Sequence, residues 1–295
     1  MEKLTFYILD VFAEDKYAGN QLAVVRDAAG LSDGEMQNIT KEMNYSETTF
    51  ILSDNQRNGG YDVRIFTPAE EVPFAGHPTL GTAYIIQQEI IKEPLEKIIL
   101  NLKVGQIPVS FNYRGKDKNV LWMQQKEPTF GQIIEPEQIS EVLCINTSDI
   151  DERFPVQEVS TGLFFMIVPL KNLDAVKRAT VDRDKYFRLI ENRQAKAILV
   201  FCPETYFQEN NLNVRVFVDY FGIPEDPATG SGNGCLAGYL VKLRYFGKDQ
   251  IDIRAEQGYE IGRPSLIYLR AKNKEGQIDV SVGGKAVMIA RGELA

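Results

Sequence analysis

Histidine is almost absent from this chain, which carries one, His77, among its 295 residues. The usual metal centres gather several histidines or cysteines, and the three cysteines, Cys144, Cys202 and Cys235, form no CxxC pair. The sequence therefore predicts no metal site. An odd number of widely spaced cysteines is typical of reduced thiols, which indicates a cytoplasmic protein.

An excess of basic residues is also lacking, because 33 Lys and Arg stand against 41 Asp and Glu and leave a net charge of -8. Surfaces that bind nucleic acid or anionic membranes need clustered Lys and Arg. No apolar run approaches the roughly 20 residues of a membrane-spanning helix. The first residues lack a charged segment followed by an apolar one, so we expect no signal peptide. We therefore expect neither a nucleic-acid partner nor a membrane.

The chain is roughly twice as long as a typical domain, which favours two domains. We predict a boundary that separates residues 1–125 from 126–295, with terminal strands that can cross back to the first domain. Short runs of β-branched and aromatic residues between turn residues predict strands in both halves. Ser32 and Glu35 form a capping-box pattern before a helix, and Pro78 is expected to be the first residue of another.

A weak internal repeat relates the two halves. Val63–Phe66 (VRIF) matches Val214–Phe217 (VRVF), and an acidic loop containing proline, a glycine and an almost entirely apolar helix follow each copy. The order of these features predicts two similar domains. We expect their glycine turns, at Gly76 and Gly230, to meet at a cleft.

The two glycine turns are the best candidates for a binding site. Phe74–Pro78 and Ala228–Gly234 each stand just before a predicted buried helix. Unpaired amides at a helix start, together with the positive end of the helix dipole, bind anions. The alternative is that the glycines only permit the turns. Neither segment is a P-loop, because the GxxxxGK[ST] pattern is missing.

Three side chains near these turns have both a structural and a catalytic interpretation. His77 can be an ordinary residue of a helix start, Asp226 can cap a helix, and Glu47 can be a solvated residue before a strand. The residue types alone do not select Glu47 for catalysis.

The motifs of the chain, taken together, resemble those of the PhzF-like phenazine-biosynthesis family. They occur in family order and cover nearly the whole sequence. The matching segments are Asp10–Phe12, Tyr17–Asn20, Asn44–Phe50, Arg64–Pro68, Pro73–Pro78, Glu225–Ser231, Gln257–Gly258 and Gly262–Ser265. The resemblance implies an α+β fold like that of diaminopimelate epimerase, in which two pseudo-symmetric domains each wrap a curved, mostly antiparallel sheet around a central helix.

The resemblance also implies the site. Glu47 matches the catalytic glutamate of the family, His77 and Asp226 match its polar partners, and the substrate carboxylate is expected at backbone amides of the two turns. The substrate-binding residues implied are Asn20, Gly76, Gly230 and Ser231. The resemblance implies a homodimer, and the single histidine and the lack of nucleotide or thiolate motifs predict no cofactor.

Two positions depart from related patterns. Gln21 stands where the motif around Asn20 usually has proline, which leaves the rigidity of that loop open. Ala75 and Thr229 stand where the related epimerases and racemases place cysteines, so we do not expect a two-cysteine mechanism.

The expected activity is a cofactor-independent proton transfer with a double-bond shift on a small carboxylate-bearing substrate, for which a dihydro-hydroxyanthranilate-like acid is a candidate. Glu47 would act as general acid and base, and burial near Asp226 would raise its pKa. One alternative is a serine hydrolase that uses Ser231, His77 and Asp226, although the GxSxG elbow is missing. The other is a protein that binds small anions without turnover.

Overall fold

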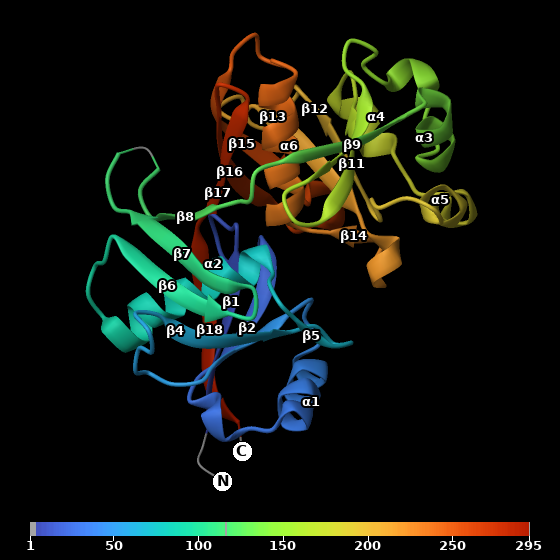
Figure 1. Ribbon diagram of the computed structural model, residues 1–295. Coiled ribbons are helices and arrows are strands. Elements are labelled where there is room, and N and C mark those ends of the chain that lie inside the picture. Colours follow the sequence, from blue (N-terminus) through green and yellow to red (C-terminus); the bar gives the residue numbers. More distant parts are fainter. Residues whose placement is uncertain (1–3, 116, 295) are drawn as a thin grey trace. The chain divides into compact units, whose positions relative to one another are not determined.

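The structure is a computed structural model that describes residues 4–115 and 117–294 (Figure 1). The chain divides into two compact units. Unit 1 runs to Met123 and resumes at Gly283, and unit 2 is Gln124–Val282. Both units combine strands with helices, which confirms the predicted α+β class.

Unit 1 contains most of its strands before residue 125, as the β-branched runs predict. Its elements are β1 (Leu4–Val11), β2 (Asn20–Val25), α1 (Asp33–Met43), β3 (Thr48–Ile51), β4 (Tyr61–Phe66), β5 (Glu71–Val72), α2 (Gly76–Ile85), the π-helix η2 (Ile86–Ile91), β6 (Lys97–Leu102), β7 (Gly105–Asn112), β8 (Val120–Gln124) and β18 (Ala286–Leu294).

Unit 2 begins with a strand that the sequence pattern did not predict and adds a layer of short helices. Its elements are β9 (Thr129–Ile134), α3 (Pro136–Val142), β10 (Val156–Ser160), β11 (Phe164–Pro169), α4 (Leu173–Arg178), α5 (Arg183–Ile190), β12 (Ala197–Cys202), β13 (Leu212–Phe217), the 3-10 turn η4 (Asp219–Phe221), β14 (Glu225–Asp226), α6 (Gly230–Lys242), β15 (Gln250–Gln257), β16 (Ser265–Lys274) and β17 (Gln277–Gly284).

The strands of the two units pair in the same order. In unit 1, β18, β1, β2, β3, β4 and β5 are successive neighbours, and only β2 and β3 are parallel. In unit 2, β9 to β14 pair in turn, and only β11 and β12 are parallel. β4 also pairs in parallel with β6, as β13 does with β15. The four-residue repeat in the sequence is therefore part of a repeat that spans both units.

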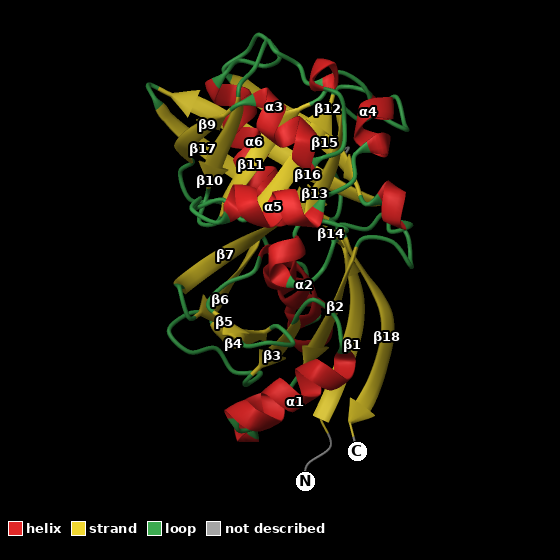
Figure 2. Ribbon diagram, turned by 90° about the vertical axis from the view of Figure 1, so that its right-hand side faces the viewer, coloured by secondary structure: helices red, strands yellow, loops and turns green. Residues whose placement is uncertain are grey.

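One apolar helix is enclosed within each unit. All of α2 except Gly76 and Tyr84 is buried, and all of α6 except Ser231 and Lys242. Figure 2 shows α2 among the strands of its unit. Gly81 permits close packing there, because a Cβ at this position would lie 2.5 Å from a methyl carbon of Leu22. A helix that is apolar on every side needs such surroundings.

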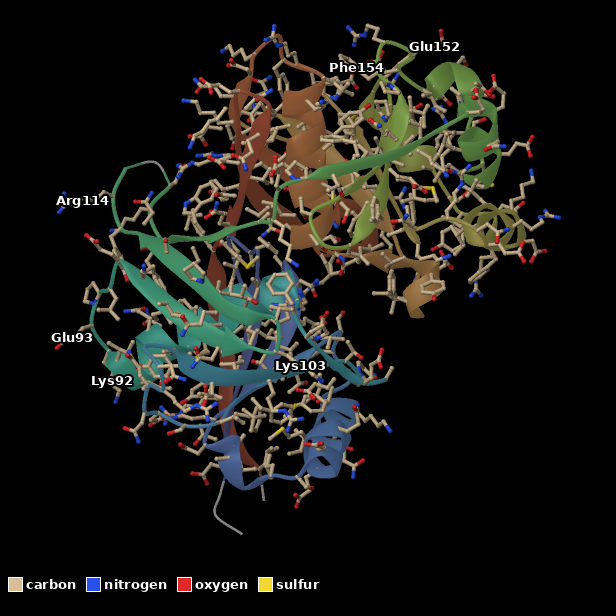
Figure 3. The ribbon with its side chains drawn as sticks, in the orientation of Figure 1. Lys92, Glu93, Lys103, Arg114, Glu152 and Phe154 are labelled. Atoms are coloured by element: carbon tan, nitrogen blue, oxygen red, sulfur yellow. The ribbon has the colours of Figure 1, made fainter. Side chains whose placement is uncertain are left out.

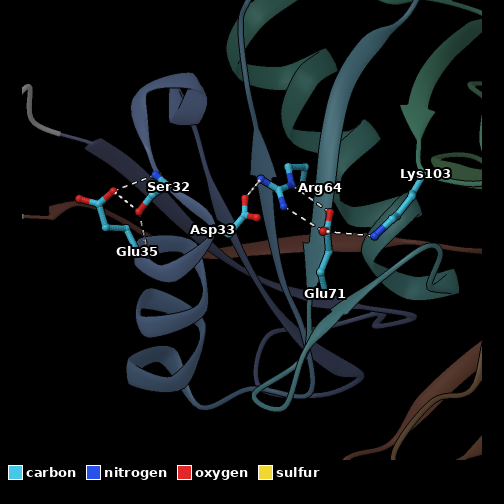
Figure 4. Close-up of polar contacts among 6 residues, drawn as sticks. All are labelled: Ser32, Asp33, Glu35, Arg64, Glu71 and Lys103. Carbon is cyan, nitrogen blue, oxygen red and sulfur yellow. Dashed lines mark hydrogen bonds and ion pairs between the residues drawn. The ribbon is translucent and has the colours of Figure 1, made fainter.

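The helix starts agree with the sequence at α1 and differ at α2. The Ser32 hydroxyl accepts a hydrogen bond from the Glu35 amide, and Glu35 accepts one from the Ser32 amide, which confirms the capping box (Figure 4). α2 begins at Gly76, two residues before the predicted Pro78. The prediction was wrong because a proline is tolerated anywhere in the first turn, where its missing N–H would have no intrahelical acceptor.

Charged side chains lie on the outside of each unit. Lys92, Glu93 and Arg114 extend from the surface of unit 1 (Figure 3), and all three are exposed. Among the described residues, no helix is long and apolar enough to cross a membrane.

Candidate active site

Glu47 and His77 come from different elements of unit 1 and lie side by side. Glu47 immediately precedes β3, and His77 is the second residue of α2. A hydrogen bond of 2.8 Å between the hydroxyls of Thr49 and Thr82, both fully buried, joins β3 to α2. This contact sets the position of α2 along β3. As a result, His77 Nε2 lies 3.5 Å from Glu47 Oε2.

Burial determines the protonation of His77. Only 7% of its side chain is exposed, and loss of solvation lowers its pKa to about 3, although a hydrogen bond to the backbone of Gln21 acts in the opposite direction. Nε2 makes no hydrogen bond within the described part of the chain. Since Nε2 has no hydrogen-bond partner there, we assign the bond to Gln21, and with it the proton of the neutral ring, to Nδ1. Nε2 is then an acceptor that faces the Glu47 carboxyl group.

The start of α2 can bind an anion. Its N-cap, Ala75, has no side chain that could cap the helix, and no side-chain cap is present. The amides of Gly76 and His77 precede the first intrahelical hydrogen bond, which runs from Thr79 to the carbonyl of Ala75. These amides and the helix dipole favour a negatively charged ligand.

The start of α6 repeats this arrangement in unit 2. Its N-cap, Thr229, makes no side-chain cap either, and the first intrahelical bond runs from Asn233 to the Thr229 carbonyl. The amides of Gly230 and Ser231 therefore also precede the first intrahelical hydrogen bond, and with the helix dipole they favour a negatively charged ligand. Ser231 is half-buried, whereas the residues on both sides of it are buried. The helix is thus accessible at its first turn.

Strand register shows which residues occupy equivalent places in the two units. Phe66 pairs with Thr48 and Glu71, and its counterpart Phe217 pairs with Ile198 and Glu225. Counting from these anchors gives three relations. Glu47 corresponds to Ala197, His77 to Ser231, and Val72 to Asp226. Each unit therefore carries polar groups that the other lacks.

An arginine–glutamate ion pair also recurs in the repeat, half-buried in unit 1 and buried in unit 2. Arg64 makes two hydrogen bonds to Glu71, both of 2.9 Å (Figure 4). Arg215 makes two to Glu225, of 3.0 and 2.8 Å. The pair in unit 1 joins β4 to β5, and the pair in unit 2 joins β13 to β14. β5 and β14 are the short strands that lead into the two glycine turns. The pairs therefore stabilise the backbone that precedes each helix start.

The other predicted site residues have defined places. Asn20 is the buried first residue of β2 and immediately precedes Gln21, which binds His77. Asp226 is half-buried in β14, and its carboxylate accepts a 2.5 Å hydrogen bond from the Thr229 hydroxyl. The structure thus brings Glu47 and His77 together in unit 1 and places Asp226 near the start of α6 in unit 2. That both groups meet in one cleft stays a prediction.

Some residues that build the site carry no clear signal in the sequence. Thr49 and Thr82 are ordinary in composition, and their contact depends on packing between β3 and α2. Gln257 is fully buried and binds the turn before α6, and the family motif that contains it does not by itself indicate this role. Aligning the two halves as EVPFAG and EDPATG would have indicated that Asp226 is specific to unit 2.

The arrangement around His77 does not favour the serine hydrolase alternative. A hydrolase histidine directs one ring nitrogen to a carboxylate and the other to the serine hydroxyl. Here one nitrogen binds the backbone of Gln21, and Nε2 faces Glu47. In the described residues, no group of three or more His, Cys, Asp or Glu side chains is placed to hold a metal ion.

Comparisons with known proteins identify the family of the chain. Residues 9–292 match the family described as phenazine biosynthesis-like protein. An uncharacterized isomerase of Clostridium acetobutylicum is 32% identical over 100% of this chain and 99% of its own. The trans-2,3-dihydro-3-hydroxyanthranilate isomerase of Pseudomonas aeruginosa is 32% identical over 97% of this chain and 98% of its own.

Solved structures show the same fold. A phenazine biosynthesis protein of the PhzF family from Bacillus anthracis has a TM-score of 0.90 at 27% identity, with 100% of both chains covered. A probable proline racemase from Agrobacterium radiobacter has a TM-score of 0.62 over 99% of this chain and 93% of its own, and at 8% identity it shows the fold alone. The chain therefore belongs to the phenazine biosynthesis-like family of PhzF-type isomerases.

Proposed function

We propose that the protein is a cofactor-independent isomerase that shifts a proton and a double bond on a small carboxylate-bearing substrate, with Glu47 as general acid and base. The observation that carries this proposal is the 3.5 Å approach of His77 Nε2 to Glu47 Oε2 at the start of α2. Relatives named trans-2,3-dihydro-3-hydroxyanthranilate isomerase supply the substrate class.

In the proposed reaction, Glu47 removes a proton from a substrate carbon, so that a C–H bond breaks and an O–H bond forms. The electron pair enters the adjacent conjugated system. Glu47 then returns the proton to another carbon, and the double bond moves with no net gain or loss of electrons. Neutral His77 supports the intermediate stage, because its Nε2 can accept a hydrogen bond from protonated Glu47.

The glycine turns would hold the substrate. We propose that amides at Gly76, His77, Gly230 and Ser231 bind the carboxylate, because amides at helix starts stabilise negative charge without adding a competing acid. Asn20 and Asp226 would contact the polar groups of the same substrate molecule. Binding in one orientation would present one carbon to Glu47.

The repeat favours a proton shift over racemisation. Racemisation by two bases requires a proton donor or acceptor on each face of the carbon. The counterpart of Glu47 in unit 2 is Ala197, which has no proton to exchange, and Ala75 and Thr229 stand where the related racemases place their two cysteines. A single carboxylate would therefore take the proton and return it on the same face.

The test is turnover of trans-2,3-dihydro-3-hydroxyanthranilate in heavy water, with the protein and its Glu47→Gln variant. The native protein should place deuterium at the reprotonated carbon. Glu47→Gln keeps the volume of the side chain and removes the titrating group, so the rate should fall by ~10²–10⁴. Binding of 3-hydroxyanthranilate, a stable aromatic carboxylate, should be retained.

Glu42→Gln is the matched control, because Glu42 is an exposed glutamate on α1 and should tolerate the change with full activity. Full activity of Glu47→Gln would refute the role of Glu47. Binding of the carboxylate without any turnover by the native protein would instead support the non-catalytic alternative.

A further inference from the structure

A buried polar network surrounds the turn before α6. Gln257 has no exposed surface, and each of the two polar atoms of its side chain makes two hydrogen bonds. Oε1 accepts from the Thr229 amide at 3.2 Å and from Asn233 Nδ2 at 2.8 Å. Nε2 donates to the Asp226 carbonyl at 2.8 Å and to the Thr229 hydroxyl at 3.0 Å. The glutamine side chain is therefore fully satisfied by this one turn.

The backbone partners establish the orientation of the Gln257 amide. The Thr229 amide can only donate, and the Asp226 carbonyl can only accept, so Oε1 and Nε2 cannot be exchanged. Since Nε2 donates to the Thr229 hydroxyl, the hydroxyl proton is available for the Asp226 carboxylate, 2.5 Å away. The hydrogen bonds therefore run in one direction, from Gln257 through Thr229 to Asp226.

Gly258 fixes the strand that carries Gln257 against the same turn. Its φ is +78°, and a Cβ there would lie 2.6 Å from the Pro227 carbonyl oxygen and 2.4 Å from that of Arg263. The Ser265 hydroxyl donates to the Pro227 carbonyl at 2.9 Å. The turn and the end of β15 are thus held together by backbone contacts as well as by Gln257.

Unit 1 forms the same turn without this network. By strand register, Asp226 corresponds to Val72, Thr229 to Ala75, and Gln257 to Leu102. Both turns lead from a two-residue strand into a buried helix that starts four residues later. The network is therefore not needed to make the turn. Its polar members occur only in the unit in which the turn carries a carboxylate.

We propose that Thr229 and Gln257 are positioning residues that orient the Asp226 carboxylate toward a hydrogen-bond donor on the substrate. The inference rests on the proposed function, in which Asp226 contacts the substrate. A charge-assisted hydrogen bond restricts the side-chain rotation of the carboxylate and favours its ionised form. In the proposed function the same turn binds the substrate carboxylate, so the group that meets Asp226 would be an amino or hydroxyl group of the substrate.

The test measures kcat and KM for trans-2,3-dihydro-3-hydroxyanthranilate in Thr229→Val, which replaces the hydroxyl by a methyl group at nearly the same volume. Loss of a hydrogen bond to a charged group should lower kcat about 10- to 100-fold, with KM changed by less than about threefold. Thr229→Ser restores the hydroxyl and should recover most of kcat. Gln257→Leu, which reproduces Leu102 of unit 1, should lower kcat in the same way.

Thr40→Val is the control, since Thr40 is a fully buried threonine whose hydroxyl bonds to Met36 within α1. It should leave kcat and KM unchanged. Thr229→Ala is a second test variant, because unit 1 forms the same turn with Ala75. It should fold and show the kcat loss of Thr229→Val.

Asp226→Asn separates the two proposals. If it is inactive while Thr229→Val retains native kcat, the positioning role is refuted and the proposed function stands. If Asp226→Asn is fully active, the role of Asp226 in the proposed function fails. Unfolding of both Thr229→Val and Thr229→Ala would overturn the inference, because Thr229 would then be structural.

Discussion

At the residue scale, the site depends on one buried histidine that stays neutral. His77 is enclosed at the start of α2, where desolvation holds its pKa near 3. A protonated imidazole beside Glu47 would hold that carboxyl group as an anion through an ion pair. A neutral imidazole instead offers an acceptor to the protonated form of the Glu47 carboxyl group, which suits the acid–base role proposed for Glu47.

The depressed pKa of His77 predicts a pH-dependent stability. Below pH 6.5 the unfolded chain binds a proton at this histidine and the folded protein does not, so stability should be lost as pH falls from 6.5 toward 3. The slope from this group is about 1.4 kcal/mol per pH unit. Between pH 6.5 and 5, the free energy of unfolding should therefore fall by ~2 kcal/mol more in the native protein than in His77→Asn.

Urea unfolding of both proteins at several pH values measures this difference. The activity of both proteins should also be measured against pH. Titration of His77 should cause no inflection near pH 6.5 in the profile of the native protein. Parallel stability curves for the two proteins would mean that His77 titrates normally and is accessible to water.

At the scale of elements, the same strand–turn–helix unit is used twice with different side chains. The paired Arg and Glu, the proline and the helix-starting glycine recur in both copies, whereas the groups proposed for chemistry do not. Unit 1 carries a carboxylate and an imidazole, and unit 2 carries a serine and a carboxylate that accepts a hydrogen bond from Thr229. The residues that recur in both units stabilise the same backbone turn, and the residues that differ supply the groups proposed for chemistry.

The two arginine–glutamate pairs should differ in their effect on stability. Arg215 and Glu225 are 9% and 6% exposed, and Arg215 also binds the carbonyls of Val176 and Ala179 at the end of α4. Arg215→Met would leave Glu225 buried without its partner, so the free energy of unfolding should fall by ~3–5 kcal/mol.

Arg64→Met is the matched comparison. Arg64 and Glu71 are 24% and 22% exposed, so water can solvate the remaining carboxylate, and Lys103 lies 3.5 Å from it. We expect a loss of ~1 kcal/mol in this variant. Unfolding of both variants in guanidinium measures the two losses in the free energy of unfolding. Equal losses would show that burial does not distinguish the two ion pairs.

At the scale of the whole molecule, the proposed reaction needs only groups that the chain supplies. In the proposed mechanism, Glu47 is the base and amides at the helix starts bind the substrate anion. Activity should therefore survive extensive dialysis against EDTA. The assay is isomerisation of trans-2,3-dihydro-3-hydroxyanthranilate before and after chelation, with zinc added back. Loss of activity after treatment with EDTA, with recovery when zinc is added, would contradict the proposal.

The family resemblance also leads us to expect a homodimer. Sedimentation equilibrium should give a species of twice the chain mass of 33.3 kDa. A single species at 33.3 kDa over a wide concentration range would exclude a stable dimer.

Local patterns in the sequence determined much of the fold. The capping box at Ser32, the apolar helices after Gly76 and Gly230, and the strands rich in β-branched residues all depend on neighbours a few residues away. The repeat was visible because Arg215 and Arg64 occupy the same place in similar strands. The family motifs supplied Glu47 as a candidate, which residue chemistry alone did not.

Only the tertiary structure decided which of these residues meet. His77 lies beside Glu47 because of the parallel pairing of β2 with β3 and the contact between Thr49 and Thr82. Gln257 binds Thr229 because β15 pairs with β13. Such contacts join segments far apart in the chain and depend on strand register and helix packing. A local pattern of residue types contains neither, so the positions of the polar partners could not be derived from the sequence alone.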